Sequence, residues 1–185
     1  YKRQAEYFLG GDTGIRGLAI SPDQKYAYLA DHTYGLKVLD ISDIKNPILV
    51  SQYAIDNGAQ YNVSISNDGN TVYLASIQYG VRVIDVSNPL LPDFLGGYDR
   101  EGTAYPLGMV ESADGNTLYV AAYEFFLSID VSDKTNVTPN FSVGTAGFYS
   151  WDIVLSPDEQ IAFLASGPYV KIYDISDPLQ AVLIT

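Results

Sequence analysis

The single histidine of the chain, His32, directly follows Asp31, and this pair is the first candidate for acid–base chemistry. A carboxylate that orients an imidazole can create a general base. Neighbouring residues on an extended chain point to opposite faces, however, so adjacency alone does not build such a dyad. No Gly-x-Ser-x-Gly sequence supplies a nucleophile either. We therefore favour an exposed loop histidine and predict no catalytic residue.

Four aspartates recur with a constant spacing and could be interpreted as metal ligands. They are Asp40, Asp85, Asp130 and Asp174, separated by 45, 45 and 44 residues. Each is followed two positions later by serine, an arrangement in which the carboxylate can bond the backbone of a turn. The chain has no Asp-x-Asp-x-Asp-Gly calcium loop and no cysteine for a thiolate site. We predict a structural role for these aspartates, and no metal or cofactor.

Aromatic residues form the third candidate group. The chain has 16 tyrosines and one tryptophan, and many of them stand in the segments between short apolar runs. Aromatic clusters with a few carboxylates suit stacking on sugars or peptides, or contact with a cationic group. The alternative is that the rings only fill gaps between neighbouring elements. We predict a binding face made by Tyr34, Tyr61, Tyr79, Tyr105, Tyr123, Tyr149 and Trp151.

The elements that must position these residues are revealed by an internal repeat. A second landmark precedes each repeated aspartate, and its serines, Ser21, Ser66, Ser112 and Ser156, are 45, 46 and 44 residues apart. Each copy contains four short strand-like runs and no apolar period of 3.6 residues. A period of about 45 residues with four strands per unit is typical of a propeller blade, whereas solenoid repeats are usually shorter. The sequence predicts an all-β protein, a β-propeller built of four-stranded antiparallel blades, at about 12–55, 56–100, 101–144 and 145–185.

The first turn of each copy is expected to be a tight hairpin. Asp68-Gly69 and Asp114-Gly115 combine an aspartate that bonds its own backbone with a glycine that accepts positive φ. Gln24 and Glu159 replace that glycine in the first and fourth copies, so those turns should be slightly strained or of another type.

Both ends of the chain resemble outer strands. Residues 5–11 match Phe94–Gly97 and indicate the outer strand of a preceding or closing blade over 1–11, while Val182–Thr185 begins another outer strand. Pieces of five outer strands then accompany four inner triplets. This count favours four visible blades of a larger propeller, and the alternative is a ring closed by pairing of the two termini. A start at Tyr1 is typical of a processed chain or an excised fragment.

The composition restricts the classes of partner. The net charge is −12, and an acidic surface repels nucleic acid and anionic lipid. No run approaches the roughly 20 apolar residues of a membrane span. We therefore expect neither a nucleic-acid partner nor a membrane span.

The repeat resembles known families in its third and second strands. The segment Val81–Pro89 is similar to the LVIVD repeat of bacterial and archaeal propeller proteins, and Leu36–Asp43 is nearly as similar. The Ser-x-Asp-Gly and Tyr-Leu-Ala segments resemble YVTN-type surface propellers. The resemblance implies an extracellular, cell-surface or periplasmic protein, but no particular chemistry, because the matching residues are structural.

Three functions follow as expectations. The first is a non-enzymatic binding or structural module that engages a protein or glycan partner through the aromatic face. The second is a lactonase-like hydrolase active in the propeller channel, with a metal held by carboxylates, for which Glu111 and Asp152 are the main candidates. The third is a building block of an extracellular filament or surface layer, in which propeller edges assemble with further blades or other chains.

Overall fold

The chain forms four antiparallel sheets of four strands each, in a computed structural model that describes residues 7–8, 14–56, 58–99 and 105–184. Sheet order follows sequence order in each case, so each sheet is one blade, and the predicted all-β propeller fold is confirmed. The first blade holds β1 (Ile15–Ile20), β2 (Tyr26–Asp31), β3 (Gly35–Asp40) and β4 (Ile48–Tyr53). The second holds β5 (Gln60–Ile65), β6 (Thr71–Ser76), β7 (Gly80–Asp85) and β8 (Asp93–Tyr98). The third holds β9 (Pro106–Glu111), β10 (Thr117–Ala122), β11 (Phe125–Asp130) and β12 (Thr138–Gly144), and the fourth holds β13 (Ser150–Leu155), β14 (Ile161–Ser166), β15 (Tyr169–Asp174) and β16 (Val182–Leu183).

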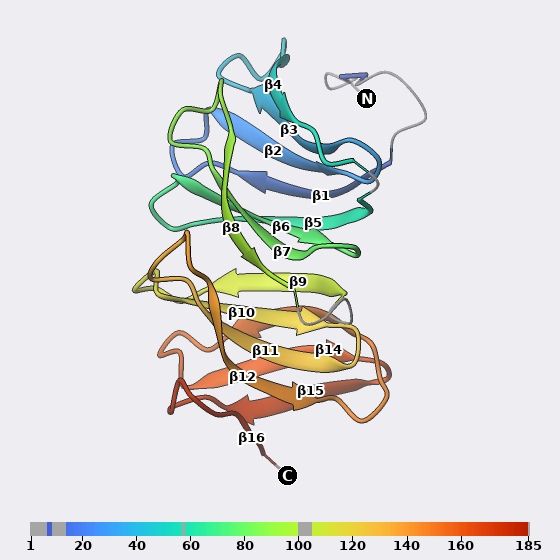
Figure 1. Cartoon of the computed structure of the whole chain (residues 1–185), viewed down its shortest axis with the longest axis vertical. Coiled ribbons are helices and arrows are strands. Elements are labelled where there is room, and N and C mark those ends of the chain that lie inside the picture. The colour runs from blue at the N-terminus through green and yellow to red at the C-terminus, as the bar shows by residue number, and fades with distance from the viewer. Residues whose placement is uncertain (1–6, 9–13, 57, 100–104, 185) are drawn as a thin grey trace.

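Neighbouring blades contact each other through their inner strands: β1 contacts β5, β5 contacts β9 and β9 contacts β13. Figure 1 shows the four sheets arranged in order along the long axis, with the first and fourth at opposite ends. None of the described residues belongs to a helix able to cross a membrane. The predicted outer strand at the C-terminus is confirmed as β16, which pairs with β15. The outer strand expected over residues 1–11 falls outside the described residues except for Tyr7 and Phe8, and the Tyr7 hydroxyl accepts a hydrogen bond from the Leu49 N–H at 3.2 Å.

The first turn has one geometry in all four blades. The repeated serine hydroxyl donates to the aspartate two residues later at 2.6 Å in every copy. The glycine position has positive φ, 76° at Gly69 and 73° at Gly115, and also 61° at Gln24 and 54° at Glu159. The strain expected at Gln24 and Glu159 is therefore present, and the turn type is unchanged because the same serine–aspartate bond closes it.

The hydrophobic core lies between successive blades. One cluster joins blades one and two, a second joins blades two and three, and a third joins blades three and four. Close approach of the inner strands requires glycine at two positions. A Cβ on Gly17 would lie 2.7 Å from the Asn62 Cα, and one on Gly108 would lie 2.6 Å from the Asp152 Cα.

Buried tyrosines in the second and third strands make the fold sensitive to alkaline pH. Burial raises the pKa of Tyr28 to about 12 and also raises the pKa values of Tyr73, Tyr119 and Tyr173. In the unfolded chain these groups ionise near pH 10, so between about pH 10 and pH 12 the native state binds more protons. The free energy of unfolding should be constant below this window with respect to these groups, and should fall within it by up to about 1.4 kcal/mol per pH unit for each tyrosine. Urea unfolding followed across the window, with Tyr28→Phe expected to reduce the slope by one proton, checks this prediction; a slope equal to that of wild type would contradict it.

The first and fourth blades each expose a face whose counterpart is buried in the other blades. Three residues before the serine landmark, Val63, Met109 and Ile153 are 5%, 9% and 4% exposed, but Leu18 is 58% exposed. In the third strand, Leu36, Val81 and Phe126 are fully or almost fully buried, whereas the equivalent Val170 is 67% exposed. The surfaces at Leu18 and Val170 therefore have the apolar character of a blade-to-blade interface without a neighbouring blade on them.

This difference gives a matched pair of substitutions at one repeat position. Leu18→Ala should lower the free energy of unfolding by less than about 1 kcal/mol, because the side chain is already in water. Ile153→Ala should lower it by about 2–4 kcal/mol, because it leaves a cavity between blades three and four. Chemical denaturation of both variants checks the prediction, and equal costs would contradict the assignment of Leu18 to an uncovered face.

Candidate functional site

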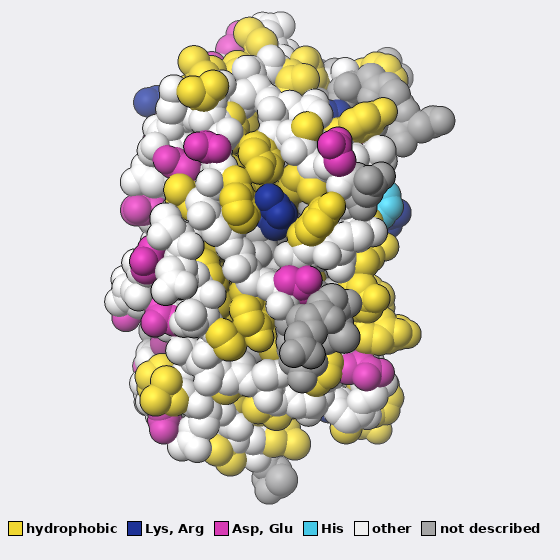
Figure 2. All heavy atoms as spheres, viewed as in Figure 1, with side chains coloured by type: hydrophobic (Ala, Val, Ile, Leu, Met, Phe, Trp, Pro, Cys, Tyr) yellow, Lys and Arg dark blue, Asp and Glu magenta, His cyan; other side chains and the backbone are white. Residues whose placement is uncertain are grey.

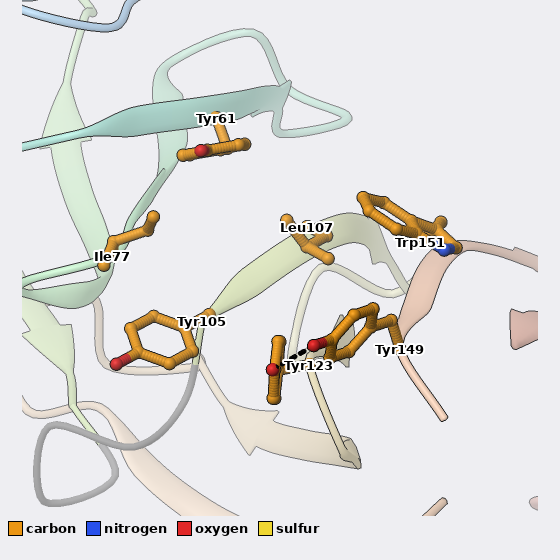
Figure 3. Close-up of a pocket in the computed structure, with 7 residues that line it drawn as sticks. All are labelled: Tyr61, Ile77, Tyr105, Leu107, Tyr123, Tyr149 and Trp151. Carbon is orange, nitrogen blue, oxygen red and sulfur yellow. Dashed lines mark hydrogen bonds between the residues drawn. The ribbon is translucent and has the colours of Figure 1, made fainter. Parts of the chain in front are cut away.

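Five of the predicted aromatic residues meet in one apolar pocket at the end of the blades where the inner strands begin. The pocket has a volume of about 370 Å³. Tyr61 lies in β5 and Trp151 in β13, while the other rings come from the approaches to β9 and β13 and from the β10–β11 turn. Figure 3 shows Tyr61 and Ile77 on one side of the pocket and Tyr105, Tyr123 and Tyr149 on the other. The lining residues are Tyr61, Ile77, Tyr105, Leu107, Tyr123, Tyr149 and Trp151.

Four of the rings form a continuous row. Tyr105 meets Tyr123 edge to face, with ring centroids 5.5 Å apart and an interplanar angle of 78°. Tyr123 lies against Tyr149 at 3.9 Å, and Tyr149 meets Trp151 edge to face at 5.9 Å and 86°. These contacts link blade three to blade four and fix the orientation of each ring.

The Tyr123 and Tyr149 hydroxyls are hydrogen-bonded to each other, with Tyr123 as the donor. This bond is the main cause that raises the pKa of Tyr123 to about 12, with smaller contributions from burial and the Glu124 charge. Tyr123 is therefore neutral at physiological pH. The row contributes ring faces and a hydrogen-bonded pair of hydroxyls to the pocket.

The repeat explains how three of these side chains converge. Five residues before the serine landmark, the four blades carry Arg16, Tyr61, Leu107 and Trp151. Equivalent positions on successive inner strands face the same end of the propeller, and the last three line the pocket. The Arg16 guanidinium lies 5.5 Å from the centroid of the Tyr61 ring, so at this repeat position the first blade places a cation beside the Tyr61 ring.

Two predicted members of the binding face lie elsewhere. The Tyr34 ring is 5.4 Å from the Lys37 ammonium, and the Tyr79 ring is 5.3 Å from the Arg82 guanidinium. Neither tyrosine lines the pocket, because the turn that carries each of them has three residues between its paired positions, and the corresponding turn at Tyr123 has two. Ile77 was not predicted. It occupies the same position after the serine landmark as Tyr123, and that equivalence would have found it.

The four repeated aspartates lie at the opposite ends of their strands, away from the aromatic row. Each carboxylate accepts the N–H of the serine two residues later, at distances from 2.8 to 2.9 Å. These serine hydrogen bonds hold the pKa values of Asp40, Asp130 and Asp174 below the usual range. In these contacts the carboxylates close turns.

His32 is half-buried, so the expectation of an exposed loop histidine is wrong. Its ring meets Tyr61 of the next blade edge to face at 5.5 Å, and this contact covers it. Asp31 points away from His32 and forms an ion pair with Lys37, with Oδ2 and Nζ 2.6 Å apart. The adjacent aspartate and histidine thus belong to two different contacts, as the alternation of side chains along a strand requires.

The carboxylates considered for a channel metal are engaged by the protein. Glu111 is buried and accepts hydrogen bonds from the Asn67 N–H at 2.7 Å and the Tyr73 hydroxyl at 2.6 Å. Asp152 is exposed, and its Oδ1 accepts the Ile153 N–H at 2.9 Å. Within residues 7–8, 14–56, 58–99 and 105–184, no three His, Asp or Glu side chains are grouped so that they could hold a metal ion.

The repeat also identifies the family. Residues 16–55, 58–100 and 112–145, more than half of the chain, match the family model of the LVIVD repeat. The chain belongs to the LVIVD-repeat family. The fourth copy lies outside the matched residues, although its sheet has the same topology as the other three.

Solved structures with the same fold span several kinds of protein. A functionally unknown protein from Desulfotomaculum acetoxidans aligns with a TM-score of 0.75 at 20% identity, over 95% of this chain and 56% of that one. The periplasmic gluconolactonase PpgL of Pseudomonas aeruginosa aligns with a TM-score of 0.80 at 15% identity, over 94% and 53%. The β-propeller domain of Cps50 (Swd1) from Myceliophteria thermophila aligns with a TM-score of 0.67 at 14% identity, over 94% and 58%.

The LVIVD-repeat chain therefore spans little more than half the length of these propeller structures. At such low identities the likeness establishes the propeller fold alone. No curated protein sequence matches the chain.

Proposed function

We propose that this LVIVD-repeat chain is a non-enzymatic binding module of an exported, surface-associated propeller, and that the aromatic pocket engages its protein or glycan partner. The observation that carries the proposal is the pocket itself, in which five rings from three blades surround about 370 Å³ at one end of the inner strands. Exposed aromatic side chains in a concave site provide a large contact area with little loss of side-chain entropy on binding. The uncovered faces at Leu18 and Val170 support the placement of the module in a larger assembly of blades.

The test uses a printed oligosaccharide array and a display library of short random peptides as probes. Wild type should bind a subset of these probes, and the triple substitution Tyr61→Ala, Tyr105→Ala, Trp151→Ala should weaken binding at least about tenfold. The matched control is Tyr34→Ala with Tyr79→Ala, which removes two rings from the same end of the blades outside the pocket. Unchanged binding by the triple variant, or no bound probe at all, would contradict the proposal.

A lactonase-like hydrolase is the second candidate, supported by the structural likeness to the periplasmic gluconolactonase of Pseudomonas aeruginosa. It requires carboxylates that can hold a metal near the channel, and Glu111 and Asp152 are the inner-strand candidates. Gluconolactone hydrolysis is measured with added Ca²⁺, Mg²⁺ or Zn²⁺, for wild type and Glu111→Gln. Metal-dependent turnover that Glu111→Gln abolishes would favour the enzyme over the binding module.

A further inference from the structure

The aromatic pocket has few groups that could satisfy a polyhydroxylated ligand. Among the described residues that line it, the side-chain polar atoms are the tyrosine hydroxyls and the Trp151 N–H, and two of the hydroxyls bond each other. Leu107 and Ile77 complete the lining. A sugar placed here would leave most of its hydroxyls without partners, which costs free energy when they are buried. The part of the partner that enters the pocket is therefore expected to have an apolar surface.

The rings also provide an electrostatic preference. The face of an aromatic ring carries partial negative charge, and several faces around one space attract a cation. The chain already uses this interaction at other sites. Lys37, Arg82, Lys134 and Lys171 each place their charge within 4.1–5.7 Å of a ring centroid.

Within the pocket, Tyr61 also has a cation beside it, the Arg16 guanidinium 5.5 Å from its ring centroid, but no cation of the described residues lies over Tyr105, Tyr123, Tyr149 or Trp151. The repeat supplies the reason: Leu127 occupies in blade three the strand position that Lys37 and Arg82 occupy in blades one and two. Leu127 is buried, so blade three offers aromatic faces without the cation that the repeat elsewhere places beside them.

Apart from Arg16 beside Tyr61, the surrounding charge has the matching sign. The net charge of the chain is −12, and Glu124 and Asp152 directly follow two of the pocket residues in sequence. Figure 2 shows Asp and Glu side chains spread over the visible face of the molecule, with few Lys or Arg among them. Such a surface raises the local concentration of cationic ligands.

We infer that the pocket of Tyr61, Tyr105, Tyr123, Tyr149 and Trp151 takes a quaternary ammonium group, a fully alkylated nitrogen, carried by the proposed partner. A primary ammonium or guanidinium donates several hydrogen bonds, and among the described lining side chains only tyrosine hydroxyl oxygens could accept them. A quaternary ammonium donates none, presents methyl groups to the rings and keeps its charge. The inference rests on the proposed binding function and names the ligand class of the same pocket.

Trp151 is the only tryptophan of the chain, so its fluorescence reports directly on the pocket. The probes are choline, its neutral isostere 3,3-dimethylbutan-1-ol, and ethanolamine, which has an unmethylated ammonium. Choline should change the emission saturably, and the two analogues should bind about tenfold more weakly. Equal binding of choline and the neutral isostere, or stronger binding of ethanolamine, would overturn the inference.

Two substitutions of Tyr123 leave the Trp151 fluorophore in place and distinguish the effect of the aromatic ring from that of side-chain volume. Tyr123→Leu removes one ring and should weaken choline binding about tenfold, whereas Tyr123→Phe keeps the ring face and should retain most of the affinity. Tyr34→Leu, outside the pocket, is the matched control and should bind as wild type does. Unchanged binding by Tyr123→Leu would also overturn the inference.

The same titration separates this inference from the proposed function. An oligosaccharide or peptide without a quaternary ammonium that changes Trp151 emission, while choline does not, overturns the cation site and leaves the binding module supported. If neither choline nor any oligosaccharide or peptide probe binds, both the ligand class and the proposed function are wrong.

Discussion

Asp31→Ala is expected to lower the free energy of unfolding by about 3–5 kcal/mol, because it leaves the buried Lys37 ammonium without its partner. Both side chains are buried, and Oδ2 and Nζ are 2.6 Å apart. The other carboxylate oxygen accepts the N–H groups of Thr33 and Tyr34 at 3.0 and 3.1 Å. Burial acts to raise the pKa of Asp31, but the hydrogen bonds from Lys37, Thr33 and Tyr34 outweigh it and hold the pKa below its usual value.

A double-mutant cycle in urea measures this pair directly. Lys37→Met alone should also be strongly destabilising, while the double variant Asp31→Ala, Lys37→Met should lose clearly less than the sum of the single losses. The control is the exposed pair Lys25–Asp23, 3.4 Å apart, where Lys25→Met should cost less than about 0.5 kcal/mol. Additive losses in the cycle, or a cost below about 1 kcal/mol for Asp31→Ala, would contradict the account of this pair.

The second large effect is expected at Glu111, where Glu111→Ala should lower the free energy of unfolding by about 3 kcal/mol. The carboxylate of blade three accepts the Asn67 N–H and the Tyr73 hydroxyl of blade two, and its Oε1 lies 3.2 Å from the Lys134 Nζ. Its removal leaves a fully buried tyrosine hydroxyl and a backbone N–H without acceptors. The loss of unfolding free energy therefore arises at the interface between blades two and three.

Glu159 provides the matched control for the contact that Glu111 makes between blades two and three. Its Oε1 accepts the Ala113 N–H at 2.7 Å, so it joins blades three and four in the same way, but at an exposed site. Glu159→Ala should cost less than about 1 kcal/mol, because water replaces the lost acceptor. Thermal and urea unfolding measure the loss of unfolding free energy in Glu111→Ala and Glu159→Ala. Equal losses in the two variants would contradict the prediction.

The repeat made the fold predictable because two independent landmarks specify it. The serine–aspartate turn and the Asp-x-Ser strand end recur with nearly one period, and each is closed by a local hydrogen bond that the sequence itself contains. Even the replacement of glycine by Gln24 left the turn unchanged, since the same local bond remains. Local chemistry of this kind can be inferred from one copy and checked in the next.

The aromatic pocket was only partly predictable because its membership depends on turn length and on contacts between blades. Tyr34 and Tyr79 were expected beside Tyr123, but a longer turn and a cation three residues later hold their rings elsewhere. The position of His32 against Tyr61 depends on how closely two blades approach. The ion pair of Asp31 with Lys37 was missed for a different reason: the two residues are diagonal neighbours on the β2–β3 hairpin, with Asp31 opposite Gly35 and Lys37 opposite Leu29, and their burial was not evident from the sequence.

The residues that build the blades are distinct from the aromatic residues that form the pocket. The alternative is that the pocket rings serve mainly to fill the space between blades. One measurement tests this most directly: the free energy of unfolding of the triple variant Tyr61→Ala, Tyr105→Ala, Trp151→Ala, determined beside its binding to the probes that wild type binds. We expect the free energy of unfolding to fall by about 1 kcal/mol or less per ring, because these side chains are partly exposed, and we expect binding to be lost. Severe destabilisation with binding retained by the folded fraction would contradict it.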